Sequence, residues 1–177
     1  TLITEFLEDK QCLNILSLNC NLVIFCPKNK YNDIWQYRKK NKLLSKTCIV
    51  YKTNESNIID FIDKSIKSNY FSSSYFCWIN YDTNLEEEFF PENFIDKLIF
   101  NCDDKIHFIS LFKNNIYRFS DKLYLFNFDN AIIFIDIMNS LLKNNTFLDS
   151  HNICYLNNKN NFISHIVYDE KKFYLDF

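Results

Sequence analysis

The chain has 177 residues, of which 47% are apolar and 18% aromatic, and its formal net charge is −2 at pH 7. These values predict one globular domain over residues 1–177 and argue against nucleic acid as the ligand. No apolar run reaches the roughly 18 residues of a membrane span, no signal peptide is recognisable, and the absence of glycine excludes Walker A loops, Rossmann fingerprints and nucleophile elbows.

The first part of the chain alternates strand-like and helix-like patterns. In chain order we predict a strand at 1–7, a helix at 12–18, a strand at 22–26, a helix at 31–40 with Ile34, Trp35 and Tyr37 facing inward, a strand at 48–51, and a helix that Asn54 caps and that carries Ile58, Ile59, Ile62 and Ile66. Because helices separate these strands, they are expected to be parallel.

The second part of the chain begins with a buried strand at 75–79. We then predict a helix over 86–99, strands at 106–112, 116–119 and 123–128, a helix at 129–142, a helix at 149–160, and short closing strands over 165–177. The fold class is therefore α/β, a single three-layer domain with a mostly parallel sheet and an antiparallel patch late in the chain. Without glycine, positive φ angles are expected to fall largely to Asn or Asp.

The strand at 75–79 is apolar on both faces and stops in the polar triplet Asn80-Tyr81-Asp82. Ligands of open α/β sheets bind in the crevice beyond the carboxyl ends of the strands. The amide of Asn80 and the carboxylate of Asp82 are oxygen ligands of the kind that a divalent cation prefers. Both residue types also favour turns, so the alternative interpretation is that they only end the strand.

Seven cysteines are scattered along the chain without a C-x-x-C pair. This pattern is typical of small buried side chains in a reducing compartment, so a cytoplasmic protein without a disulfide framework or a zinc site is expected. The abundant Asn, Lys, Ile, Phe and Tyr are encoded by codons rich in A and T, which indicates the AT-rich genome of a virus, parasite or endosymbiont.

Four segments match the pattern of one known family in the same order. Residues 69–80, N-Y-F-S-S-S-Y-F-C-W-I-N, are similar to its block N-P-F-x-S-x-Y-F-A-W-I-D, and residues 1–7 are similar to its opening strand T-I-V-T-A-F-F-D. Residues 16–25 are similar to its second strand and the preceding helix, and residues 147–152 lie where it has a T-D-E-Q-like segment. The chain thus resembles a divergent and shortened member of the HtrL/YibB (WlaTC/HtrL) family of glycosyltransferase-like proteins.

The resemblance implies a GT-A-like nucleotide-sugar fold and a transferase that moves a sugar from a nucleotide donor to a hydroxyl of a glycan or protein. It also implies Mn²⁺ or Mg²⁺, held at the end of a central strand, which neutralises the departing nucleoside diphosphate. On this chain Asn80 and Asp82 would be the metal ligands, and Asp149 would be the catalytic base that activates the acceptor hydroxyl. Thr4 and Phe6, at the edge of the first strand, would flank the nucleotide.

The chain also departs from the family pattern. The W-I-D of the family is W-I-N at residues 78–80, which removes a charge that Asp82 would have to replace. Its glycine pair is replaced by the bulky residues 126–128, and the segment before Leu13 is shorter. Two alternatives to an enzyme therefore stay open: a catalytically degenerate domain that binds a protein partner or has a structural role, and an unrelated α/β domain with similar strands.

Overall fold

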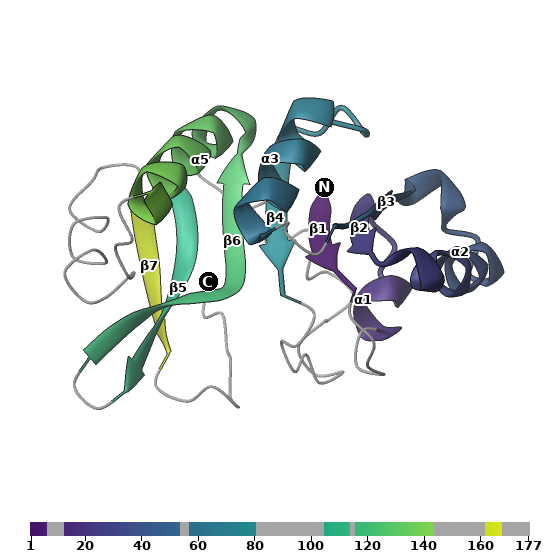
Figure 1. The fold of residues 1–177 in the computed structure, drawn as a ribbon, viewed down its shortest axis with the longest axis horizontal. Coiled ribbons are helices and arrows are strands. Elements are labelled where there is room, and N and C mark those ends of the chain that lie inside the picture. The colour runs from purple at the N-terminus through teal and green to yellow at the C-terminus, as the bar shows by residue number, and fades with distance from the viewer. Residues whose placement is uncertain (7–12, 54–56, 81–104, 114–115, 144–161, 168–177) are drawn as a thin grey trace.

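The computed structural model describes residues 1–6, 13–53, 57–80, 105–113, 116–143 and 162–167. They form a seven-stranded sheet with helices against both faces (Figure 1). The strands are β1 (Leu2–Glu5), β2 (Leu22–Cys26), β3 (Thr47–Tyr51), β4 (Tyr75–Ile79), β5 (Ile106–Lys113), β6 (Ile116–Asn127) and β7 (Phe162–Val167). The helices are α1 (Leu13–Ser17), α2 (Tyr31–Lys40), α3 (Ile58–Ser68) and α5 (Phe128–Lys143), with short 3₁₀ turns at Lys28–Lys30 and Leu44–Lys46.

The strands are ordered β3-β2-β1-β4-β6-β5-β7 across the sheet. β1, β2, β3 and β4 are parallel, β6 is antiparallel to both of its neighbours, and β7 is parallel to β5. Of the seven described strands, six therefore share one direction and β6 runs against them. This topology confirms the mostly parallel sheet and the antiparallel patch that the sequence predicts.

β6 is one continuous strand where the sequence predicts two, at 116–119 and 123–128. Polar residues lie between the two apolar runs, and in the sequence they indicate a break between two strands. In the sheet, the register of β5 against β6 shifts between Phe108 and Ile109. Such a bulge bends a strand without ending it, so the polar residues remain within β6.

Both faces of the sheet are covered, as the apolar pattern of β4 predicts. Phe76 and Trp78 belong to the core under α3 and α5, whereas Cys77 and Ile79 belong to the core under α1 and α2. In Figure 1, α3 and α5 lie together at the top of the view, and α1 and α2 lie beside β2 and β3. The central strand at 75–79 and the three-layer architecture are therefore confirmed.

Helix α3 has polar caps at both ends. The sequence places its cap at Asn54, outside the described residues, whereas the structure places the cap at Asn57, whose Oδ1 accepts from the backbone N–H of Ile59 and Asp60. The Asp60 carboxylate accepts in turn from the N–H of Asn57 and completes a capping box. At the other end Asn69 has φ 35° in the left-handed region, in place of the usual glycine.

Asparagine is only one of the residue types that adopt a positive φ angle in the described residues. Within the described part of the chain, Lys42 and Ser72 also have positive φ, at 60° and 50°. The expectation that Asn or Asp would take most such positions is therefore wrong for two of these three residues. Both lie in short connections between elements, where the path of the chain outweighs the preference of the residue type.

The guanidinium of Arg38 in α2 is fully buried, and each of its five N–H groups donates a hydrogen bond. The acceptors are the backbone carbonyls of Leu16, Leu18, Cys20 and Lys46 and the hydroxyl Oγ1 of Thr47, at distances of 2.7 to 3.3 Å. Arg38 therefore joins the end of α1 and the turn after it to the start of β3.

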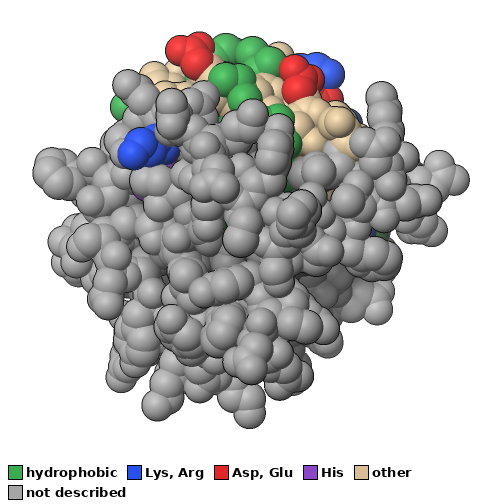
Figure 2. Space-filling view, turned by 90° about the vertical axis from the view of Figure 1, so that its left-hand side faces the viewer, with side chains coloured by type: hydrophobic (Ala, Val, Ile, Leu, Met, Phe, Trp, Pro, Cys, Tyr) green, Lys and Arg blue, Asp and Glu red, His purple; other side chains and the backbone are tan. Residues whose placement is uncertain are grey.

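Helix α5 confirms the predicted helix at 129–142. Its buried side chains recur at helical spacing, at Ala131, Phe134, Ile135 and Met138. Its outer surface combines apolar and acidic side chains (Figure 2), with Phe128, Ile132 and Ile133 as the exposed large apolar residues. None of the helices in the described ranges has the length and apolar character needed to cross a membrane.

Two predicted helices, at 86–99 and 149–160, lie entirely outside the described residues. The closing strands predicted over 165–177 correspond in part to β7, which begins at Phe162 and ends at Val167. β7 pairs with β5 over six residue pairs, so its position at the sheet edge follows from that ladder.

Candidate functional site

The carboxyl ends of β1 and β4 meet where the chain changes direction across the sheet. From β1 the chain adds β2 and then β3 on one side, and it returns to place β4 on the other side of β1. The two strands pair in parallel, with Ile3 opposite Trp78. The crevice at such a topological switch point is where ligands bind in open α/β sheets. The residues at the ends of these strands therefore define the candidate site.

The two predicted nucleotide-flanking residues help to hold this edge together. The buried Thr4 hydroxyl donates a hydrogen bond to the carbonyl of Ile79 at 2.8 Å, which joins the end of β1 to the end of β4. The backbone N–H of Phe6 donates to the carbonyl of Phe25 at 2.7 Å, and its half-buried ring packs against the core under α1 and α2. Their role as nucleotide contacts stays a prediction.

Asn80 lies directly after β4 and is 8% exposed. The parallel register of β1 and β4, continued by two residues from Ile3 and Trp78, aligns Asn80 with Glu5. The structure thus brings Asn80 to the same corner as Thr4, and the role of Asn80 as a metal ligand stays a prediction. Asp82 and Asp149, the other two predicted site residues, lie outside the described residues.

The sequence interpretation missed an ion pair at this edge. The ammonium of Lys52, directly after β3, contacts Oε1 of Glu5 at the end of β1, and the two side chains are only 13% and 19% exposed. Lys52 is fixed by its backbone N–H, which donates to the carbonyl of Cys26 at 3.0 Å. The signal available in the sequence was one charged residue within or directly after each predicted strand, Glu5 in the strand at 1–7 and Lys52 after the strand at 48–51, since parallel strands bring their carboxyl ends together.

Burial is the main electrostatic effect at the neighbouring thiol. Burial raises the pKa of Cys26, the last residue of β2, to about 11, while the nearby Lys52 ammonium acts in the opposite direction. Cys26 is therefore a protonated, inert thiol near neutral pH. It contributes packing to the edge and no nucleophile.

A cavity of about 330 Å³ opens beside Glu5. It is lined by Glu5, the first turn of α3 from Asn57 to Ile59, Phe61, Tyr124 and Met138. This lining is mainly apolar with one carboxylate, which suits a flat, partly apolar group that can donate a hydrogen bond. The cavity and the switch point share Glu5, so both belong to one edge of the sheet.

The described residues offer an incomplete set of ligands for a divalent cation. At the switch point they supply the amide of Asn80 and the carboxylate of Glu5, and that carboxylate is paired with Lys52. Across the described ranges, no group of three or more His, Cys, Asp or Glu side chains is arranged to hold a metal ion. A cation at this corner would therefore need Asp82 as a further ligand.

Comparisons by sequence identify no relative. No protein-family model matches the chain, and no curated protein matches it. The resemblance to the HtrL/YibB family therefore stays a prediction.

Comparison of the fold does identify similar structures. 4-Diphosphocytidyl-2C-methyl-D-erythritol synthase from Anaerococcus prevotii is similar over 94% of this chain and 85% of its own, with a TM-score of 0.58 and 9% identity. A Bacillus anthracis protein assigned as a glucose-1-phosphate thymidylyltransferase is similar over 89% of this chain and 71% of its own, with a TM-score of 0.51 and 8% identity. At such low identity the likeness shows the fold. The chain therefore shares its α/β fold with these two proteins.

Proposed function

We propose that this chain is a transferase domain that binds a nucleotide-sugar at the carboxyl edge formed by β1 and β4. The observation that supports this most directly is the switch point itself, where Thr4, Glu5 and Asn80 converge at the ends of two adjacent parallel strands. The mainly apolar cavity next to Glu5 offers space for the flat base of a nucleotide.

The proposed reaction is transfer of the sugar from its nucleoside diphosphate to a hydroxyl of a glycan or protein. Thr4 and Phe6 would flank the nucleotide, and Asp149 would accept the proton of the acceptor hydroxyl. Mn²⁺ or Mg²⁺, held by Asn80 and Asp82, would stabilise the charge of the departing diphosphate.

A second candidate is nucleotidyl transfer, in which a sugar phosphate attacks a nucleoside triphosphate and pyrophosphate leaves. The two structural neighbours named above favour it, because their names describe a diphosphocytidyl-methylerythritol synthase and a thymidylyltransferase. The two candidates use the same nucleotide position and differ in the leaving group. They are therefore separated by the product that is released.

Binding is tested by thermal unfolding with UDP-sugars and with CTP or dTTP, each with and without Mn²⁺. A ligand at 100 times its Kd stabilises the fold by about 2.7 kcal/mol, which raises Tm by about 5 to 11 °C for a chain of this size. Asp82→Ala is expected to abolish the Mn²⁺-dependent part of this shift. Asp33→Ala, an exposed carboxylate in α2, is the matched control and is expected to retain it.

Turnover is tested in the same samples. Release of a nucleoside diphosphate from a UDP-sugar in the presence of an acceptor supports glycosyl transfer, and release of pyrophosphate from CTP or dTTP with a sugar 1-phosphate supports nucleotidyl transfer. Binding without either product supports the degenerate binding module, to which the uncharged Asn80 is suited. Absence of any shift with all nucleotides would contradict a nucleotide site at this edge.

A further inference from the structure

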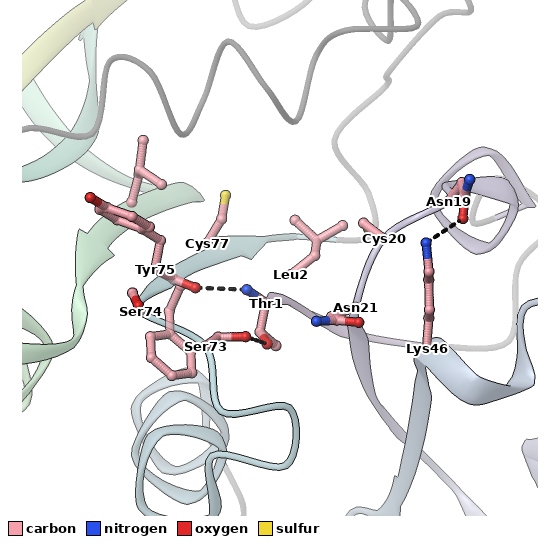
Figure 3. Close-up of a pocket in the computed structure, with 12 residues that line it drawn as sticks. Thr1, Leu2, Asn19, Cys20, Asn21, Lys46, Ser73, Ser74, Tyr75 and Cys77 are labelled. Atoms are coloured by element: carbon pink, nitrogen blue, oxygen red, sulfur yellow. Dashed lines mark hydrogen bonds between the residues drawn. The ribbon is translucent and has the colours of Figure 1, made fainter.

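A cavity of about 430 Å³ opens at the other edge of the sheet, beside the amino ends of β1 and β4 (Figure 3). Lys46 and Asn19 lie on one side of this amino-edge cavity, Tyr75 and Ser74 lie on the other, and Leu2 lies between them. Its volume is typical of a small-molecule site. It lies at the opposite ends of the strands whose carboxyl edge forms the proposed nucleotide site, and it shares no lining residue with the cavity beside Glu5.

The charge of the amino-edge cavity has one sign. Lys46 is a cationic side chain in its wall, and none of the described residues that line it is acidic. The ammonium of Lys46 donates to the amide oxygen of Asn19 at 2.9 Å, so this partner does not neutralise it. The ion pairs found in the described part of the chain, Glu5–Lys52 and Asp63–Lys67, do not include Lys46.

Arg38 adds a second positive charge behind the same wall. Its guanidinium donates to the carbonyls of Cys20 and Lys46, at 3.2 and 3.3 Å, and none of the acceptors of its five N–H groups is a carboxylate. Burial raises the pKa of the Cys20 thiol, while Arg38 and Lys46 both act in the opposite direction. The positive charges of Arg38 and Lys46 therefore both favour a negative charge at Cys20, in the cavity wall, and Arg38 also holds that wall in place.

The opposite wall is fixed by Asn69, the left-handed cap of α3. Its Oδ1 accepts from the N–H of Ser73 at 2.8 Å, and its Nδ2 donates to the carbonyl of Ser73 at 3.2 Å. These bonds hold Ser73 and Ser74 at the mouth of the cavity, beside the ring of Tyr75. The cavity is thus formed by two anchored segments, with Ser73 and Ser74 on one side and Lys46 on the other.

We propose that the amino-edge cavity is a second binding site, for a small organic anion that carries a phosphate or carboxylate head group on an apolar body. The head group pairs with the Lys46 ammonium and accepts a hydrogen bond from the side-chain amide of Asn21. The apolar body packs against Leu2 and Tyr75. This proposal does not depend on the proposed nucleotide site at the carboxyl edge, because the two sites share no residue.

The test is a titration of the ¹⁵N-labelled protein with phenyl phosphate and with benzoate, followed by amide NMR. We expect saturable shifts at Asn21, Lys46 and Ser74 with at least one of these probes, and the stronger probe identifies the head group. Benzyl alcohol, which has the ring and no charge, is expected to bind at least about tenfold more weakly, because a hydrogen bond to a charged group is lost.

Two substitutions locate the charge. Lys46→Met and Lys46→Gln both leave the backbone carbonyl that Arg38 binds, and each is expected to weaken anion binding about tenfold or more. Lys28→Met is the matched control, because Lys28 is an exposed lysine beyond the carboxyl end of β2 that does not line the cavity, and it is expected to leave anion binding unchanged. No saturable shift with either anion, equal binding of benzyl alcohol, or unchanged affinity in both Lys46 variants would overturn the proposal.

Discussion

The buried guanidinium of Arg38 allows a quantitative test of how this fold is held together. Arg38→Met keeps a long side chain in α2 and removes all five N–H donors. Four backbone carbonyls, from the end of α1, the turn after it and the start of β3, then lose a partner together with the Thr47 hydroxyl. The Thr47 hydroxyl still donates to the carbonyl of Leu43 at 2.7 Å.

The size of the effect follows from the number of acceptors that lose a donor. A net loss of about 1 kcal/mol for each of the five bonds gives an upper value near 5 kcal/mol. Most of these contacts are only partly buried, so water can replace some donors, and removing one member of a buried charged network typically costs about 3 to 5 kcal/mol. A loss of about 3 to 5 kcal/mol lowers Tm by about 6 to 20 °C for a chain of this size.

The assay is urea unfolding, with thermal unfolding by circular dichroism as the second measurement. Lys39→Met is the matched control, because Lys39 is an exposed neighbour whose ammonium lies 4.6 Å from the Trp35 ring centroid, and we expect it to change stability by less than about 1 kcal/mol. Arg38→Lys, with three donors, is expected to fall between wild type and Arg38→Met. A free energy of unfolding for Arg38→Met within about 1 kcal/mol of wild type would refute the reasoning.

Two further predictions concern the carboxyl edge of the sheet. Asn57→Ala removes the cap that accepts from the first turn of α3, and it is expected to lower the free energy of urea unfolding by about 1 kcal/mol. Asn32→Ala, at an exposed asparagine in α2, is the control, and an equal free energy of unfolding for the two variants would contradict the cap. The raised pKa of Cys26 means that the unfolded chain loses its thiol proton more readily, so stability present below pH 9 is lost as the pH rises from 9 towards 11. Unfolding measured across this window is expected to show a smaller decline in Cys26→Ala than in wild type, and identical slopes would contradict the shift.

The fold was predictable because its strands are local patterns. Apolar runs of four or five residues identify β2, β3 and β4, an alternating pattern identifies β1, and a repeat of apolar residues at helical spacing identifies α3 and α5. Periodicity does not show which polar residue is buried. In α2, Ile34 is buried as expected and Trp35 and Tyr37 are half-buried, whereas the buried position that the pattern missed belongs to Arg38.

The candidate site was only partly predictable for a related reason. Asn80 and Thr4 follow from single strand ends, and the structure brings them to one corner. The Glu5–Lys52 pair joins residues 47 positions apart, and its existence depends on β2 lying between β1 and β3. No spacing within either segment encodes that contact, so only the strand order could identify it.

The charge balance at the carboxyl edge explains how one corner could serve both a cation and a diphosphate. Glu5 and Lys52 neutralise each other, and Asn80 adds no charge, so these three residues together are neutral. A divalent cation needs negative oxygen ligands, and at this edge the proposed site would draw them from Asp82 and from the phosphates of the nucleotide. We therefore expect the cation to bind together with the nucleotide and only weakly without it. This coupling also explains why the unfolding tests must compare each nucleotide with and without Mn²⁺, since only the nucleotide and the cation together would report on the whole site.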